Sequence, residues 1–431
     1  MKGTLINQFK AVKTDVLVVG GGPGGSTAAT FLARGGLSVA LAEREPFPRF
    51  HVGESLLPAN VPLLQRLGVL ERIAGHGFLR KNGAAFHDQE SGLEHTFYFR
   101  EGKPWPPWSF EVPRAEFDRI LLEHAAAQPG VRLLQPATVE KVGFDATGVT
   151  AHVADADGGR EVRARFLIDA SGRDGFLAAR QGRREPIPGL GKVAVFAHYR
   201  GARRWPGRDE GNIRIYVFPD GWFWWIPFAG DVTSVGCVLH ARTVRGRGGD
   251  LPALLDEMIG RCHRVAEGLA GAERVTPVHT AANFSYRAAP VIGDRFVCVG
   301  DAVAFVDPIF STGVFMAMQS AELASADVLR AFTDGRFEAR RFAAYERRFH
   351  RGAGPFLRFI GSYYDPAFLE VFLRPTERFA LLDSVTGVLA GGSFLAMPLR
   401  MRASLALFFS IVGVNRWLHR WRGRYQSRLT W

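Results

Sequence analysis

The sequence predicts an α/β fold built on a mostly parallel sheet, and three observations support this fold class. An apolar, β-branched run at residues 16–19 leads directly into a glycine-rich turn and then into a helix of small residues. A second short apolar strand follows at residues 38–42. Buried-strand patterns recur at residues 166–169 and 297–299, each followed by a polar turn. Short, continuously apolar strands of this kind are typical of a parallel sheet that is buried on both faces.

The composition places the chain among globular proteins. It has 431 residues, of which 47% are hydrophobic and 22% charged, so it can bury enough apolar surface to exclude global disorder. At roughly 100–200 residues per domain, the length predicts two or three structural units. Three scattered cysteines fit neither a disulfide framework nor a zinc site, and we expect no metal. Because we find no secretory signal and no apolar run of ~18 residues, we expect a cytoplasmic protein.

The basic charge is concentrated at the carboxyl end. The net charge is +12, and residues 400–431 contain seven arginines and no acidic residue. No nucleic-acid-binding motif accompanies this charge, so nucleic acid is not expected as a partner. An anionic membrane surface and an acidic protein partner fit the charge at least as well.

The turn after the first strand carries a nucleotide-binding pattern. Gly20, Gly22 and Gly25 match G-x-G-x-x-G between a strand and a helix, which is the context that the motif requires. The first glycine permits a tight turn, the second lets the backbone approach a pyrophosphate, and the third lets helix and strand pack closely. Glu43 ends the next strand and is placed to accept hydrogen bonds from a ribose diol. The pattern predicts a dinucleotide site and leaves NAD and FAD open.

Three later segments bear on that choice. Arg114 and Asp118 lie four residues apart on one face of a helix predicted to run through residue 124. Residues 166–173 form a buried strand that ends in a polar turn, and residues 297–302 form another that ends in Gly-Asp. Asp301 is placed there to hold a ribityl hydroxyl beside a helix amino terminus that faces a pyrophosphate. Each segment alone is equally compatible with ordinary turn and helix-cap chemistry.

In this order, the segments resemble the FAD-dependent aromatic monooxygenases, the para-hydroxybenzoate hydroxylase-like flavoproteins, over about residues 14–340. The resemblance implies a discontinuous, Rossmann-type FAD-binding module at 1–340. It also implies an inserted β-sheet substrate domain at about 80–112 and 180–285, followed by a helical, basic region at 341–431. The residues that it assigns to the cofactor are Gly20, Gly22, Gly25, Glu43, Arg44, Glu54, Ser55, Arg114, Asp301, Pro308 and Gly313.

A tryptophan-rich strand narrows the class. Trp222, Trp224, Ile226 and Pro227 match W-x-W-x-I-P. Strand alternation places Trp222 and Trp224 on one face and Trp225 on the other. The segment is either a core strand packed on both faces or a wall of rings that shapes a dry channel beside a flavin.

A second motif follows the Gly-Asp turn. Residues 305–313 match F-x-x-P-x-x-S-x-G just before a predicted helix at 314–323. Because the helix amino terminus carries free backbone amides, Ser311, Thr312 and Gly313 are placed to bind an anion. Such a site suits a halide, since no cationic side chain has to stand beside the flavin.

With the glycine turn, these two motifs resemble the flavin-dependent halogenases. The resemblance implies that a separate flavin reductase supplies reduced FAD, and that NAD(P)H does not bind productively. Oxygen would form a flavin C4a-hydroperoxide, and chloride or bromide would attack it to give hypohalous acid, which would pass down a channel to a lysine. The compact length resembles halogenases of phenols, or of aryl and pyrrolyl groups tethered to an acyl or peptidyl carrier protein.

The phenol- and pyrrole-type halogenases carry that lysine in a K-x-G segment after a G-E-S motif. Here G-E-S at residues 53–55 is followed by K-N-G at residues 81–83, so the resemblance assigns the catalytic lysine to Lys81. An amine there would capture hypohalous acid as a haloamine or orient it, and burial favours both roles. A solvated surface lysine is the alternative, because Arg80 and Asn82 flank it.

Several alternatives remain open at the level of sequence. The function is that of a reductase-dependent halogenase, of an NAD(P)H-dependent FAD hydroxylase or epoxidase, or of a flavin-binding protein without turnover. His51 and His87 are either substrate bases or ordinary structural histidines. The apolar helix expected around residues 403–414 either covers the substrate entrance, lies on the inner face of an anionic membrane, or docks an acidic carrier protein.

Overall fold

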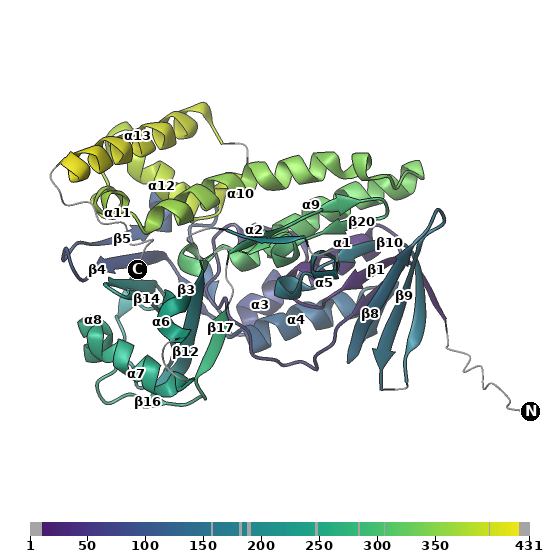
Figure 1. Ribbon diagram of the computed structural model, residues 1–431, viewed down its shortest axis with the longest axis horizontal. Coiled ribbons are helices and arrows are strands. Elements are labelled where there is room, and N and C mark those ends of the chain that lie inside the picture. The colour runs from purple at the N-terminus through teal and green to yellow at the C-terminus, as the bar shows by residue number, and fades with distance from the viewer. Residues whose placement is uncertain are drawn as a thin grey trace, which may run out of the picture.

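Two large sheets organise the part of the chain that the structure describes, which is residues 11–421 without 157, 181–182, 188–190, 246–248, 283–284, 306 and 396. In this computed structural model each large sheet has eight strands. Long helices lie across the top of the first sheet, and the carboxyl-terminal helices gather beside the second (Figure 1). The α/β fold class and the carboxyl-terminal helical region are therefore confirmed.

The first sheet is parallel at its centre. Its strand order is β19-β20-β10-β1-β2-β7, and β1 pairs in parallel with both β10 and β2. Strand β1 lies inside the sheet, and its apolar residues Val16, Leu17 and Val18 are fully buried. Helices α1, α4 and α9 pack together beside it. The bounds are β1 Val12–Val19, β2 Val39–Ala42, β7 Val131–Leu134, β8 Ala137–Phe144, β9 Val149–Asp155, β10 Arg160–Asp169, β19 Ile292–Gly293, β20 Phe296–Cys298, α1 Pro23–Arg34, α4 Arg114–Ala126, α5 Phe176–Arg180 and α9 Gly313–Asp334.

The second sheet presents two differently packed faces. Its order is β16-β12-β15-β14-β13-β4-β5, with β17 pairing to β12. Trp222 and Trp224 face the carboxyl-terminal helices, whereas Phe223 and Trp225 face α7 and α8, as strand alternation predicts. The bounds are β4 Gly83–Asp88, β5 Glu94–Tyr98, β12 Lys192–Arg200, β13 Ile213–Phe218, β14 Gly221–Pro227, β15 Val232–His240, β16 Glu273–Arg274, β17 His279–Ala282, α6 Ala241–Arg245, α7 Leu251–Arg261 and α8 His263–Gly268.

Smaller elements close the structure around these sheets. Helices α2 (Asn60–Arg66) and α3 (Leu70–Gly75) join α4 in a separate apolar cluster. Small sheets form from β3 (Leu79–Lys81) with β6 (Ser109–Glu111), and from β11 (Arg184–Pro186), β18 (Tyr286–Ala288) and β21 (Ala304–Phe305). The last helices are α10 Ala343–Tyr363, α11 Pro366–Phe372, α12 Leu381–Leu389 and α13 Leu399–Trp421. The predicted domain limits, 1–340 and 341–431, remain a prediction.

Among the described residues, no helix combines the length and the apolar character that crossing a membrane requires. Helix α13 is 23 residues long and falls short on hydropathy.

The turn between β1 and α1 depends on close backbone contact. Gly20 has a φ of +101°, a conformation that favours glycine. A Cβ atom added to Gly25 would lie 1.8 Å from the carbonyl oxygen of Gly20. Helix α1 can therefore begin directly above β1 only if position 25 lacks a side chain.

We expect Gly25→Ala to lower the free energy of unfolding by about 1–3 kcal/mol, because the methyl group must displace backbone. Gly354→Ala is the matched control: no atom lies within 4 Å of its added Cβ in helix α10. That change should be neutral or stabilising by under about 1 kcal/mol. Chemical denaturation measures both, and equal stability of the two variants would contradict the packing argument.

Candidate active site

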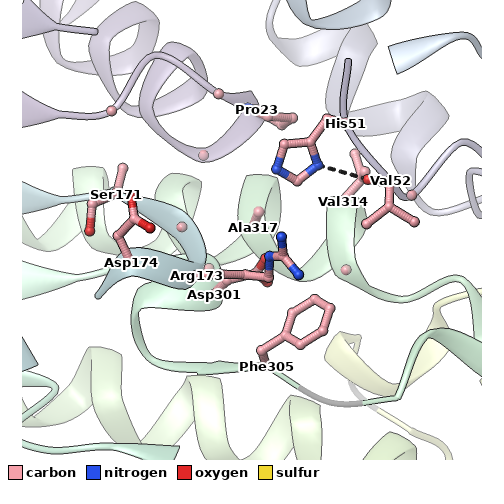
Figure 2. Close-up of a pocket in the computed structure, with 18 of the residues that line it drawn as sticks. Pro23, His51, Val52, Ser171, Arg173, Asp174, Asp301, Phe305, Val314 and Ala317 are labelled. Atoms are coloured by element: carbon pink, nitrogen blue, oxygen red, sulfur yellow. Dashed lines mark hydrogen bonds between the residues drawn. The ribbon is translucent and has the colours of Figure 1, made fainter. Parts of the chain in front are cut away.

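A cavity of about 810 Å³ lies between the two large sheets. One end is formed by the glycine turn and Glu43, and the other by Trp222, Trp224 and Ile226 of β14. The loop at residues 49–55 and the amino terminus of α9 complete its walls. Figure 2 shows Arg173 and Asp301 together in one wall, with His51 and Val52 on the opposite side.

The glycine end is fixed by the carboxylate of Glu43. Its Oε2 accepts a hydrogen bond from the Gly21 amide at 2.7 Å, and its Oε1 accepts one from the Glu45 amide at 2.8 Å. Each oxygen keeps a further lone pair, and Glu43 lines the cavity. Arg44 also lines this end and forms an ion pair with Asp174.

A buried arginine holds the loop that carries the G-E-S motif. Arg114 donates to both carboxylate oxygens of Asp118 at 2.8 Å, as expected for residues four apart on one helix face. Its Nη1 donates to the carbonyl oxygen of Val52 at 2.5 Å. Gly53 has a φ of +100°, so the loop turns sharply there. The backbone of residues 52–53 is thereby held at the cavity wall.

Asp301 places a half-buried carboxyl group in the cavity wall. It lies in the 3-10 turn Gly300–Ala302 rather than at the first residue of an α-helix. Burial raises the pKa of Asp301 to about 7, although Arg173 opposes this shift. The Tyr286 hydroxyl donates to the Asp301 carbonyl at 2.7 Å and fixes the turn.

These features fit FAD. Gly20, Gly22 and Gly24 line the cavity with bare backbone, and a Cβ at Gly20 or Gly25 would clash with the backbone that shapes this turn. The turn opens at the amino terminus of α1, where a pyrophosphate is favoured. The cavity is long enough to join this end to the aromatic strand, since both ends line one continuous space.

The amino terminus of α9 forms a second anion-binding geometry. Ser311 has a φ of +57°, Thr312 is the N-cap residue, and Gly313 is the first residue of the 22-residue helix. All three line the cavity together with Pro308. Because the first amides of a helix have no intrahelical acceptor, an anion is favoured there.

One chain of hydrogen bonds joins the aromatic strand to this turn. Trp222 Nε1 donates to the Tyr364 hydroxyl at 3.1 Å, and that hydroxyl donates to Asp307 Oδ2. Asp307 Oδ1 accepts from the Ile309 amide at 3.2 Å. All of the side chains are buried, and Lys192 Nζ lies 4.2 Å from the centre of the Tyr364 ring. Burial raises the pKa of Asp307 to about 6, although the Tyr364 hydrogen bond opposes this shift.

Lys81 is buried, with 1% of its surface exposed, so the solvated alternative is wrong. Its Nζ donates to Ser55 Oγ at 2.7 Å and to the Leu56 carbonyl at 3.1 Å. Ser55 lines the cavity, whereas Lys81 lies one side chain behind it. Burial lowers the pKa of Lys81 to about 8, against the opposing charge of Glu111.

Some predicted site residues lie elsewhere. Pro227 ends β14 and does not line the cavity, and His87 lies on β4 outside it. His51 does line the cavity; burial lowers its pKa to about 3, and Arg114 adds to this shift. A neutral imidazole with so low a pKa is a weak proton acceptor.

Three site residues were missed from the sequence. Glu111 is fully buried beside Lys81, and Tyr364 belongs to the carboxyl-terminal helices. His198 Nε2 lies 2.9 Å from Glu54 Oε1 at the edge of the cavity. Only Glu111 had a usable signal, because an acidic residue in an apolar strand pattern next to Arg114 is unusual.

Comparison with known proteins identifies the family to which the chain belongs. Residues 13–359 match the FAD binding domain family, and the chain belongs to this family. It is 34% identical over 91% of its length to a 1H-pyrrole-2-carbonyl-[peptidyl-carrier protein] chlorinase of Pseudomonas fluorescens, covering 93% of that protein. It is 31% identical over 90% of its length to the corresponding brominase of Pseudoalteromonas luteoviolacea, covering 94% of that protein.

A solved structure agrees with these relatives. The flavin-dependent brominase Bmp2 superposes with a TM-score of 0.80 at 29% identity, over 93% of this chain and 100% of that one. The chain is therefore a flavin-dependent halogenase, an oxidoreductase that uses FAD and a halide. The NAD(P)H-dependent hydroxylase alternative is not favoured.

We expect Tyr364→Phe to lower the free energy of unfolding by about 1–3 kcal/mol, because it leaves the Trp222 N–H and an Asp307 oxygen unpartnered. The emission of Trp222 should change at the same time. Tyr199→Phe is the control, since the buried Tyr199 hydroxyl has no hydrogen-bond partner among the described residues. Denaturation monitored by fluorescence measures the stability of both variants. Equal losses of unfolding free energy would contradict the importance of the hydrogen bonds that join Trp222, Tyr364 and Asp307.

Proposed function

We propose that this halogenase acts on an electron-rich aromatic group, such as a pyrrolyl group, that is tethered to a peptidyl carrier protein. It would use chloride or bromide, and a separate reductase would supply reduced FAD. The observation that carries the reaction is the arrangement of one cavity, which is lined by the amino terminus of α9, by the tryptophan wall and by Ser55, with the buried Lys81 behind it. The pyrrole-carrier relatives support the substrate class.

Bound reduced FAD supplies the electrons with which oxygen is activated for halide oxidation. Gly20, Gly25 and the amino terminus of α1 would hold its pyrophosphate, Glu43 its ribose and Asp301 its ribityl chain. The amides at Thr312 and Gly313 would hold the halide. The helix dipole favours the halide there without a cationic side chain.

The tryptophan strand would exclude water between the halide site and the substrate. Trp222 and Trp224 are 2% and 4% exposed, and their indole nitrogens already donate to Tyr364 and Ser234. Because these N–H groups are satisfied within the protein, the ring faces present mainly apolar surface to the cavity. Hypohalous acid formed there would meet few water molecules before it reaches the substrate.

Lys81 would hold the hypohalous acid at the substrate end. A change in the Ser55 side-chain rotamer would open a path to Nζ, which would then donate a hydrogen bond to the acid or, as free amine, form an N–X bond and release water. The aromatic carbon next forms a C–X bond as the X–O or X–N bond breaks, and the ring proton is released. Burial raises the pKa of Glu111 to about 8, against the opposing Lys81 charge, so Glu111 is suited to exchange a proton with the amine.

A turnover assay tests the function and the substrate class together. With a generic flavin reductase, NADH, oxygen and chloride or bromide, we expect a halogen isotope pattern on carrier-bound pyrrole-2-carbonyl. Free pyrrole-2-carboxylate and free phenols should give little product. Without reductase, NADH alone should not bleach the bound flavin in stopped flow. Fast bleaching would indicate a hydroxylase, and product only from free phenols would overturn the carrier proposal.

Lys81→Ala should reduce substrate halogenation by at least about a hundredfold, as expected when a positioned catalytic group is lost. FAD binding should persist, because the glycine turn is untouched, and monochlorodimedone should still be halogenated if hypohalous acid escapes. Lys81→Arg should not rescue, since guanidinium stays protonated. If the free amine reacts, the wild-type rate should rise with pH through about 8.

Arg80→Ala is the matched control for this experiment, because Arg80 is the exposed neighbour of Lys81. It should retain activity. Near wild-type halogenation by Lys81→Ala, with unchanged regiochemistry, would show that the lysine assignment is wrong.

A further inference from the structure

Helix α13 has two apolar faces, and only one of them is buried. Its inner face packs through Leu405, Phe408 and Val412 against α10, α11 and α12. Its outer face is open: Leu399, Val414, Trp417 and Trp421 are 79%, 60%, 63% and 75% exposed. Figure 1 shows α13 at the outside of the molecule.

This exposure is concentrated in one region. Ten large apolar side chains in the described part of the chain are exposed, and seven of them lie between residues 379 and 421. The outer face of α13 follows helical spacing, with Leu399, Ala403, Ala406, Ser410, Val414, Trp417 and Trp421 three or four residues apart. This stripe is apolar except for Ser410, and clustered apolar exposure of this kind marks an interaction surface rather than chance exposure.

The positive charge beside the stripe indicates what kind of partner binds there. Residues 399–421 contain Arg400, Arg402, Arg416 and Arg420 and no acidic residue. Arg400, Arg402 and Arg420 are exposed, and Arg416 forms an ion pair with Asp365 at the start of the neighbouring helix. A second copy docked through the same stripe would bring like charges together, which is unfavourable. The occupant therefore combines an apolar interior with an anionic surface.

We propose that the outer stripe of α13 lies in the surface of an anionic lipid membrane. Tryptophan side chains favour the membrane–water interface, and arginines at the edge of the stripe reach the headgroups. The helix is too polar to cross a bilayer, so it lies flat with its inner face still packed on the protein. An acidic carrier protein would engage the arginines, but it would not account for four exposed apolar side chains in one row.

The test uses the full-length protein with two kinds of vesicle: phosphatidylcholine alone, and phosphatidylcholine with about a third phosphatidylglycerol. The wild type should sediment with the anionic vesicles and its tryptophan emission should shift to the blue. Replacing Trp417 and Trp421 with Ala should weaken binding by at least about tenfold, because two exposed indoles no longer enter the interface. Replacing Arg402 and Arg420 with Gln should weaken it and reduce its dependence on salt.

Phe144→Ala is the control, because Phe144 is 39% exposed at the end of β8, at the other end of the molecule from α13 (Figure 1). It should bind vesicles like the wild type, and FAD binding by every variant verifies folding. No sedimentation of the wild type, or equal binding by the double tryptophan variant, overturns the proposal. The proposal is also overturned if the double tryptophan variant still binds vesicles but no longer forms a dimer, or a complex with the carrier protein, that the wild type forms. The result does not depend on the halogenation assay.

Discussion

The hydrogen bonds from Trp222 through Tyr364 to Asp307 constrain the whole active site. They join a strand of the second sheet, the residue that follows helix α10 and the turn that precedes the amino terminus of α9. The side chains of Trp222, Tyr364 and Asp307 are all buried. Breaking one of these hydrogen bonds therefore leaves a buried polar group without a partner, at a cost of about 1–3 kcal/mol. Tyr364, the C-cap residue of helix α10, therefore connects the tryptophan wall to the turn before α9. The carboxyl-terminal region does not line the cavity, but through Tyr364 it supports two elements that do.

The sequence predicted those parts of the site that depend on local sterics. Gly20 and Gly25 could be assigned because the strand, the turn and the helix lie within a few residues of one another. The two faces of β14 followed from alternation alone. Tyr364 could not be found in this way, since it lies 142 residues from Trp222 and 57 from Asp307 in sequence. No local pattern distinguishes its hydroxyl from that of any other tyrosine at the end of an apolar helix.

The burial of Lys81 shows a second limit of sequence reasoning. Arg80 and Asn82 flank it, and both neighbours favour an exposed strand. Strand β3 pairs with β6 so that Lys81 lies opposite Ser109, on the inner side with Glu111 two residues further along. Desolvation moves the pKa of the lysine and that of the glutamate toward each other, both to about 8. A neutral amine is therefore accessible near physiological pH, a consequence of tertiary packing that no neighbouring residue signals.

The two faces of helix α13 have different roles: the inner face packs in the core, and the outer face is exposed. Phe408 stacks on Phe359 of α10 at 5.6 Å between ring centres, and Phe359 lies five residues from Tyr364. The inner face thus supports the helix on which the active-site hydrogen bonds depend. The outer face contributes nothing to that support, and its exposed tryptophans remain an unfavourable apolar surface until something covers them. The inner and outer faces belong to the same helix, and the inner face is packed on the rest of the protein. A membrane bound to the outer face of α13 would therefore fix the orientation of the cavity relative to the membrane, without any movement within the site.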